Sequence, residues 1–264
     1  MRNLIIDLDA IAYNLDVMRQ RAGGVKVCGV VKANAYGHGM IEVARKLEEA
    51  GVDYLGVADV AEALELRRAG IDAPILAWLH DPQEMFVEAV NEGIELGLAN
   101  EDHLARVAAA AEITGRLARV HLKVDTGLNR NGASAAEWEG VLRQARALVA
   151  EGFIQVVGIF SHLSSTGEAE DLAQIARFDA AVEIARESGL QFELRHLTAS
   201  DGSLNYPQAQ YEMVRVGVAL YGLSPFADHH SKEYGLRPAM TATAHITQVK
   251  RVPAGEGVSY GYLH

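Results

Sequence analysis

The chain has 264 residues, of which 49% are hydrophobic and 22% are charged, a balance that is typical of globular proteins and excludes a disordered chain. Its 24 basic and 35 acidic side chains give a net charge of -11 without any Lys/Arg run longer than two residues, so we expect neither a nucleic-acid partner nor a membrane partner. The single cysteine, Cys28, excludes an internal disulfide, and the first residues resemble neither a signal peptide nor a membrane span, so we expect a soluble, cytoplasmic protein.

Short apolar runs rich in Val, Ile and Leu alternate with longer segments of helical periodicity. This alternation is typical of repeated βα units on a parallel sheet. About eight strands are predicted, and eight strands close a barrel. The sequence therefore predicts the α/β class, as a (β/α)8 TIM-type barrel. The predicted strands lie near Val27–Val31, Tyr54–Val57, Pro74–Trp78, Ile94–Leu98, Arg119–Val124, Val156–Phe160, Glu193–Leu197 and Glu212–Val216.

Two predicted helices have recognisable first residues. Asp59 precedes VAEALELRRAG, where its carboxylate can cap the first backbone N–H groups of a helix that ends at Gly70. Asp81 is followed by Pro82, and proline is favoured in the first turn of a helix. We therefore expect a second helix to begin at Asp81.

Two segments fit no barrel strand. Leu4–Asp7 is a short apolar run ahead of the first helix, and Met240–Val252 alternates with a period of two residues. Such alternation is typical of a strand with one buried face. We interpret both segments as strands of another sheet.

The segment VVKANAYGHG places Lys32 at the carboxyl end of the first predicted barrel strand. Barrel enzymes hold their active sites at this end of the strands. A partly desolvated lysine can lose its proton, attack a carbonyl group and hold a cofactor covalently. Tyr36 follows in the loop and can offer its hydroxyl to a phosphate. An ordinary solvated loop lysine is the alternative interpretation.

This loop resembles, almost letter for letter, the cofactor-lysine segment of alanine racemases, which are fold type III enzymes dependent on pyridoxal 5′-phosphate. The resemblance implies that Lys32 carries the cofactor aldehyde and that Tyr36 contacts the phosphate. It runs from residue 1 to about 240, with motifs in the correct order at five places. It also implies a second, mostly β domain, so we assign 1–238 to the barrel, 239–264 to the start of a truncated β domain, and the strand 3–7 to that domain.

The segment HLKVDTGLNRNG carries Lys123 and, seven residues later, Arg130. A surface ion pair with Asp125 is one interpretation of this segment. By the resemblance, Lys123 is commonly carbamylated, and Arg130 helps to bind the substrate carboxylate and the phenolic oxygen of the cofactor. A carbamate is an anion and can orient a guanidinium through two hydrogen bonds.

Two further strand ends carry polar residues that match the family. His162, in GIFSHLSSTGE, would by itself be a hydrogen-bonded packing residue, but the resemblance places it near the cofactor ring, against the arginine that binds the pyridine nitrogen. In RHLTASDGS, the resemblance makes Ser200 a phosphate ligand. Ala199 departs from the family, which usually has asparagine at that position.

The segment EMVRVGVALYGLSP follows the eighth predicted strand. The resemblance implies that Arg215 donates to the pyridine nitrogen and that Gly217 and Val218 offer backbone N–H groups to the phosphate. An arginine keeps its proton and leaves the ring a weaker electron sink. A rim ion pair with Glu212 is the alternative for Arg215.

Racemisation needs two groups on opposite faces of the α-carbon. Lys32 serves one face, and Tyr260, in GVSYGYLH, matches the family's second base. In the family this tyrosine reaches the partner subunit's site, so we expect a homodimer with shared active sites and no metal.

The expected activity is the interconversion of L-alanine and D-alanine, which supplies D-alanine for peptidoglycan synthesis. One alternative is a non-catalytic, single-barrel protein that binds pyridoxal phosphate, but Arg130, Tyr260 and the extra strands favour an enzyme. Another is a related racemase for serine or a similar small amino acid. We expect the 264-residue chain alone to bind the cofactor and to have weak or no racemase activity.

Overall fold

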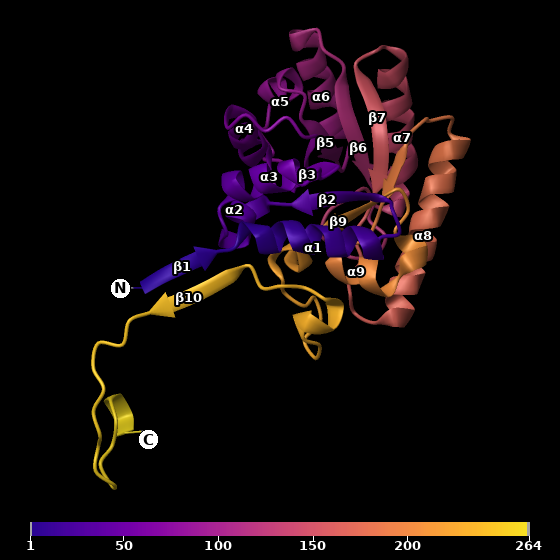
Figure 1. The fold of residues 1–264 in the computed structure, drawn as a ribbon. Helices are drawn as coiled ribbons and strands as arrows, with labels where there is room; N and C mark the ends of the chain where they lie inside the picture. The colour runs from indigo at the N-terminus through magenta and orange to yellow at the C-terminus, as the bar shows by residue number, and fades with distance from the viewer. Residues whose placement is uncertain (1, 263–264) are drawn as a thin grey trace.

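The structure is a computed structural model that describes residues 2–262. Eight parallel strands form one sheet in the order β8-β7-β6-β5-β4-β3-β2-β9, with helices arranged around them (Figure 1). The strands are β2 (Lys26–Val30), β3 (Tyr54–Val57), β4 (Ile75–Ala77), β5 (Glu95–Leu98), β6 (Ala118–Lys123), β7 (Ile154–Phe160), β8 (Leu194–His196) and β9 (Met213–Val216).

The sheet curls into a barrel, because its two edge strands meet. Thr198 lies two residues after β8, and its backbone carbonyl accepts a 3.0 Å hydrogen bond from the backbone N–H of Arg215 on β9. This contact brings β8 and β9 together without a regular ladder between them. The predicted (β/α)8 barrel is confirmed, and each of the eight predicted strands overlaps an observed one.

The strands form where apolar runs occur because both of their faces are covered, by the barrel interior on one side and the helices on the other. All residues of β3, β4 and β5 are buried. The helices are α1 (Leu8–Arg21), α2 (Lys32–Gly37), α3 (Met40–Glu49), α4 (Val60–Arg68), α5 (Val87–Asn91), α6 (Glu101–Thr114), α7 (Ala135–Ala150), α8 (Glu168–Glu187) and α9 (Ser200–Asn205), with 3-10 turns at Pro207–Ala209, Val218–Tyr221, Ser231–Tyr234 and Tyr260–Tyr262.

Helix α4 begins and ends as predicted. The Asp59 carboxylate accepts a 2.9 Å hydrogen bond from the backbone N–H of Glu62, and Gly70 takes a φ of 80° just beyond the helix. The local capping residues, Asp59 and Gly70, were therefore sufficient to predict where this helix begins and ends.

The prediction of a helix at Asp81 was wrong. Asp81 and Pro82 form a turn, in which the Asp81 side chain accepts from the N–H of Gln83 at 2.8 Å. Arg106, on α6, donates to the carbonyl of Pro82 at 2.9 Å, and a helix would have used that carbonyl internally. Helix α5 starts only after Phe86, whose φ is 56°.

A separate two-stranded antiparallel sheet pairs β1 (Arg2–Ile6) with β10 (Met240–Ala244). Figure 1 shows this ribbon projecting from the barrel, with the yellow segment after β10 running farther away. The strand predicted over 240–252 is shorter than expected, because β1 is five residues long and its pairing ends at Ala244. Between residues 2 and 262, no helix has both the length and the apolar character needed to cross a bilayer.

Candidate active site

A cavity of about 640 Å³ opens at the carboxyl ends of the barrel strands. Parallel barrels gather side chains from distant parts of the chain at this end. Nine of the ten predicted site residues line the cavity, namely Lys32, Tyr36, Lys123, Arg130, His162, Ser200, Arg215, Gly217 and Val218.

Lys32 begins α2, a short segment with an unusual backbone that we call the lysine loop. The four residues Ala33–Tyr36 all have φ near 53°, in the left-handed region. This conformation costs about 1–2 kcal/mol per L-residue, so other contacts must hold it. The Glu62 carboxylate accepts hydrogen bonds from the backbone N–H of Ala33 at 2.6 Å and of Ala58 at 2.8 Å. Helix α4 thereby ties the lysine loop to the next strand end.

Tyr36 leaves the same loop and packs against the barrel rim. Its ring lies 5.0 Å from that of Tyr221, whose hydroxyl donates to the carbonyl of Val30 at 2.8 Å. A Cβ atom added at Gly217 would lie 2.5 Å from the Tyr36 hydroxyl oxygen. Glycine is therefore required there for the hydroxyl to approach the backbone. Burial raises the pKa of Tyr36, so the phenol keeps its proton and remains a donor.

Ser200, the first residue of α9, belongs to the same group. Its buried Oγ accepts hydrogen bonds from the backbone N–H of Gly217 at 3.0 Å and of Ala219 at 3.3 Å. The Tyr36 hydroxyl, the Ser200 hydroxyl and the backbone at 217–219 thus lie on one wall, where the N–H groups of Gly217 and Ala219 point at the Ser200 oxygen. Such a donor set suits a phosphate.

Arg215 is 5% exposed and held from several sides. Its Nη1 donates to the carbonyl and Nδ1 of His196, both at 2.9 Å, and its Nη2 donates to the carbonyl of Ser161 at 2.7 Å and to Nδ1 of His162 at 3.1 Å. Arginine has five N–H donors. The remaining one, on Nε, makes no hydrogen bond within residues 2–262, and Arg215 is one of the residues that line the cavity.

The alternative in which Arg215 pairs with Glu212 was wrong. Glu212 instead binds Arg195 through three side-chain hydrogen bonds. Burial lowers the pKa of Arg215 to about 10, so the side chain is still a cation at neutral pH.

Lys123 lies among other cations and is only 5% exposed. Burial, together with the charges of Arg215 and Arg130, lowers its pKa to about 8. The alternative ion pair with Asp125 is not formed among the residues that the structure describes. A lysine with this pKa is partly neutral near neutral pH and can react as an amine.

His162 is a neutral acceptor. Burial and the neighbouring Arg215 lower the pKa of its imidazole to about 3. Because Arg215 can only donate, Nδ1 of His162 must accept. His162 therefore helps to orient the guanidinium.

Several lining residues were not predicted. Trp78 and Leu79 follow β4, and Phe160 ends β7, so the rule that strand ends line the site could have found them. Asp201 gave no such signal, because one aspartate in a turn sequence is common. It is the single carboxylate among the residues that line this cavity.

Tyr260 is the predicted residue that lies elsewhere. Its side chain is 99% exposed, and it does not line the cavity of its own chain. It belongs to the segment that runs away from the barrel (Figure 1).

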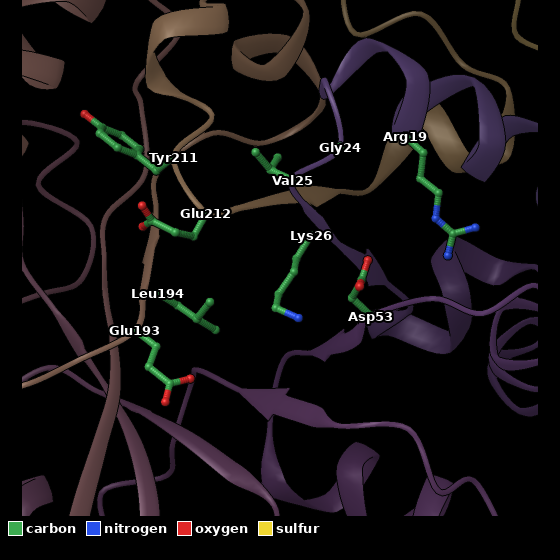
Figure 2. A pocket seen from close by; sticks show the side chains of 9 residues that line it. All are labelled: Arg19, Gly24, Val25, Lys26, Asp53, Glu193, Leu194, Tyr211 and Glu212. Atoms are coloured by element: carbon green, nitrogen blue, oxygen red, sulfur yellow. The ribbon is translucent and has the colours of Figure 1, made fainter.

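A second cavity, of about 720 Å³, opens at the amino end of the barrel. Figure 2 shows Lys26 in this opening, with the carboxylates of Asp53, Glu193 and Glu212 around it. Asp53 accepts a 2.9 Å hydrogen bond from the backbone of Val27, and Glu212 is engaged by Arg195. Two of these carboxylates, those of Asp53 and Glu212, thus serve structural contacts.

Comparison with known proteins agrees with this geometry. The family model described as "Alanine racemase, N-terminal domain" matches residues 6–225. The chain belongs to the alanine racemase family. It is 46% identical over 98% of its length to an alanine racemase of Thermobifida fusca, and 45% identical to one of Frankia casuarinae, and it spans 70% and 69% of those proteins.

Solved structures of alanine racemases share the fold. The enzyme of D-cycloserine-producing Streptomyces lavendulae has a TM-score of 0.95 and 41% identity, and that of Streptomyces coelicolor has 0.94 and 39%. All of this chain is covered in both cases, against 70% and 71% of those chains.

Proposed function

We propose that this alanine racemase family member interconverts L-alanine and D-alanine with pyridoxal 5′-phosphate as its cofactor, and so supplies D-alanine for peptidoglycan. The observation that carries the proposal is the meeting of three features in one cavity: the amine of Lys32, the donor-lined wall at Gly217, and the free Nε–H of Arg215. Each feature suits a different end of one cofactor molecule.

The residues present fit pyridoxal phosphate. Tyr36, Ser200, Gly217 and Val218 would hold the phosphate, since the absence of a Cβ at residue 217 leaves room for the tyrosine hydroxyl against the backbone. Arg215 would donate to the ring nitrogen, and Lys32 would hold the aldehyde carbon. When bound, the cofactor withdraws electrons from the amino acid and acidifies its α-hydrogen.

Two opposed groups would then move the proton. We assign the base on one face to Lys32 and the base on the other to Tyr260 of a second copy, because Tyr260 is exposed and stands apart from its own cavity. Arg130 would bind the alanine carboxylate. A carbamate on Lys123 would convert a repelling cation beside Arg130 into an anion that orients it. The proposed assembly is a homodimer.

We also propose the division into a barrel, 1–238, and the start of a β domain, 239–264, with the strand 3–7 belonging to the latter. The pairing of β1 with β10 supports this division, since the two strands bond to each other and not to the barrel sheet.

Cofactor attachment and turnover test the proposal separately. The protein is mixed with pyridoxal phosphate, reduced with borohydride, digested and mapped by mass spectrometry; we expect the pyridoxyl group on Lys32. D-Amino-acid oxidase coupled to L-alanine measures racemisation, first for the 264-residue chain and then for a version extended by the part of its relatives that the chain does not span. Attachment to another lysine, or no turnover by the longer version, would contradict the proposal.

A further inference from the structure

Four buried side chains form a continuous hydrogen-bonded row through the barrel core. Glu95 Oε2 lies 2.7 Å from His121 Nε2, His121 Nδ1 lies 2.9 Å from His196 Nε2, and His196 Nδ1 lies 2.9 Å from Arg215 Nη1. The four residues come from β5, β6, β8 and β9. The row connects the amino-end side of the core to the guanidinium in the active-site cavity.

Arg215 determines which way every proton in this row points. Because a guanidinium only donates, His196 Nδ1 must accept, and the ring proton of His196 lies on Nε2. His121 then accepts at Nδ1 and donates from Nε2 to the Glu95 carboxylate. All three bonds are satisfied by two neutral rings between one cation and one anion.

The charges at the two ends explain why the row is stable in the core. Within the described part of the chain, no carboxylate lies within 4 Å of Arg215, and a buried charge without a partner is costly. Burial disfavours the ionised form of Glu95, but hydrogen bonds from His121 and Arg119 outweigh it and hold its pKa below the usual value. Glu95 is thus the anion nearest to Arg215 along the row.

The surrounding core leaves space for these rings. A Cβ at Gly158 would lie 2.7 Å from Nδ1 of His121, and the ring of Phe160 stacks on His196 at 4.8 Å with an interplanar angle of 8°. A glycine and a stacked aromatic therefore determine where the imidazoles lie. The row is a packed feature of the barrel and does not depend on mobile surface side chains.

We propose that Glu95, His121 and His196 are positioning residues that hold Arg215 charged and oriented, with its Nε–H directed into the cavity. In the active enzyme they would act on the cofactor ring through Arg215. The link to turnover rests on the proposed function, whereas the proton order in the row does not.

The first test needs no cofactor. In the protein free of pyridoxal phosphate, ¹⁵N NMR of labelled histidines reports which ring nitrogen carries the proton. We expect both His121 and His196 to be neutral, with the proton on Nε2. A proton on Nδ1 of either ring would overturn the proposal, because the donor order would be broken.

The second test removes the charge at the far end of the row. Glu95→Gln keeps an oxygen that can accept from His121, and Glu212→Gln is the matched control, since it makes the same change at the same end of the barrel outside the row. We expect Glu95→Gln to shift the ring resonances of His196 and the absorption maximum of bound pyridoxal phosphate. We expect kcat to fall about tenfold, because loss of a residue that orients a metal ligand through a hydrogen bond has an effect of about this size. KM should stay nearly unchanged, because Arg130 still binds the substrate carboxylate.

The control should leave all these quantities unchanged. Equal effects in both variants, or an unmoved absorption maximum in a folded Glu95→Gln protein, would overturn the proposal. A wild-type protein that does not bind pyridoxal phosphate would refute the proposed function instead, and the histidine proton positions would still decide the row.

Discussion

The two ends of this barrel carry cavities of similar size, about 640 Å³ at the carboxyl end and 720 Å³ at the amino end. Their charges differ. The first is lined by four Lys and Arg side chains and one carboxylate, and the second by two Lys and Arg side chains and three carboxylates. At the amino end, Glu212 forms an ion pair with Arg195. Within residues 2–262, none of the cations at the carboxyl end has a carboxylate within 4 Å. Unbalanced positive charge, of which Lys123 and Arg215 are buried, distinguishes the candidate site more than cavity size does.

The largest expected effect compares two lysines near opposite ends of the same strand. Lys26 begins β2 and Lys32 follows its end. Lys32→Ala should abolish covalent attachment of pyridoxal phosphate and lower racemase activity by at least about 10³-fold, because one base is lost. Lys26→Ala should retain both properties, as measured by borohydride trapping and the oxidase assay. Similar losses of cofactor attachment and activity in the two variants would show that the two ends of the barrel do not differ in function.

A second prediction concerns the close approach at Gly217. Gly217→Ala would place a Cβ 2.5 Å from the Tyr36 hydroxyl oxygen, so we expect a loss of about 2 kcal/mol in the free energy of unfolding, typical of overpacking, and weaker cofactor binding. Adding Tyr36→Phe should recover part of the stability, because the closest atom is gone, but not the affinity. Urea unfolding and cofactor fluorescence measure the two quantities. A single variant as stable as the wild type would show that Tyr36 moves aside freely.

Lys123 provides a pH-dependent prediction. Its pKa is lowered from 10.5 to about 8, first by burial, so the unfolded chain binds the extra proton between these values and stability rises with pH across this window. Below pH 8 the full cost of the buried charge applies, and Lys123→Met should stabilise the protein by about 2 kcal/mol in bicarbonate-free buffer at pH 7. This is measured by urea unfolding.

Bicarbonate sharpens the same experiment. If Lys123 forms a carbamate, added bicarbonate should raise the melting temperature of the wild type and leave that of Lys123→Met unchanged. The exposed Lys26 is the control at the other end, and Lys26→Met should respond to bicarbonate like the wild type. Equal responses of the wild type and Lys123→Met would exclude the carbamate as the cause.

The smallest effect is expected at the amino end. Burial raises the pKa of Glu212, but the hydrogen bonds and charge of Arg195 outweigh it, and the net pKa is lowered. This carboxylate therefore contributes stability above its unfolded pKa near 4.5 that disappears as pH falls through the lower folded value. Glu212→Gln should cost at most about 1 kcal/mol at pH 7, because the pair is partly exposed, and the difference from the wild type should shrink below pH 4.5. If the difference in the free energy of unfolding between the wild type and Glu212→Gln grew below pH 4.5, the lowered pKa of Glu212 would be contradicted.

Elements with a clear signal in their own sequence segment, either an apolar run or a helix cap, were predicted well. The strands of the barrel follow apolar runs that only a doubly covered sheet buries, and α4 follows the cap at Asp59. The failures have tertiary causes. Arg106 takes a carbonyl that a helix at Asp81 would need, and β10 stops at Ala244 because its partner β1 has no further residues to pair with.

Among the site residues, Lys32, Arg130 and Arg215 could be named from the sequence because each belongs to a segment, near the end of a predicted strand, that resembles a motif of the family. The sequence alone determined the strands, the barrel and the identity of these side chains, since apolar periodicity and strand-end chemistry are local properties. Only the tertiary structure decided that Tyr36 meets Gly217, and that Arg215 is joined through two histidines to Glu95. These contacts join residues up to 181 and 120 positions apart, and closure of the barrel brings them together.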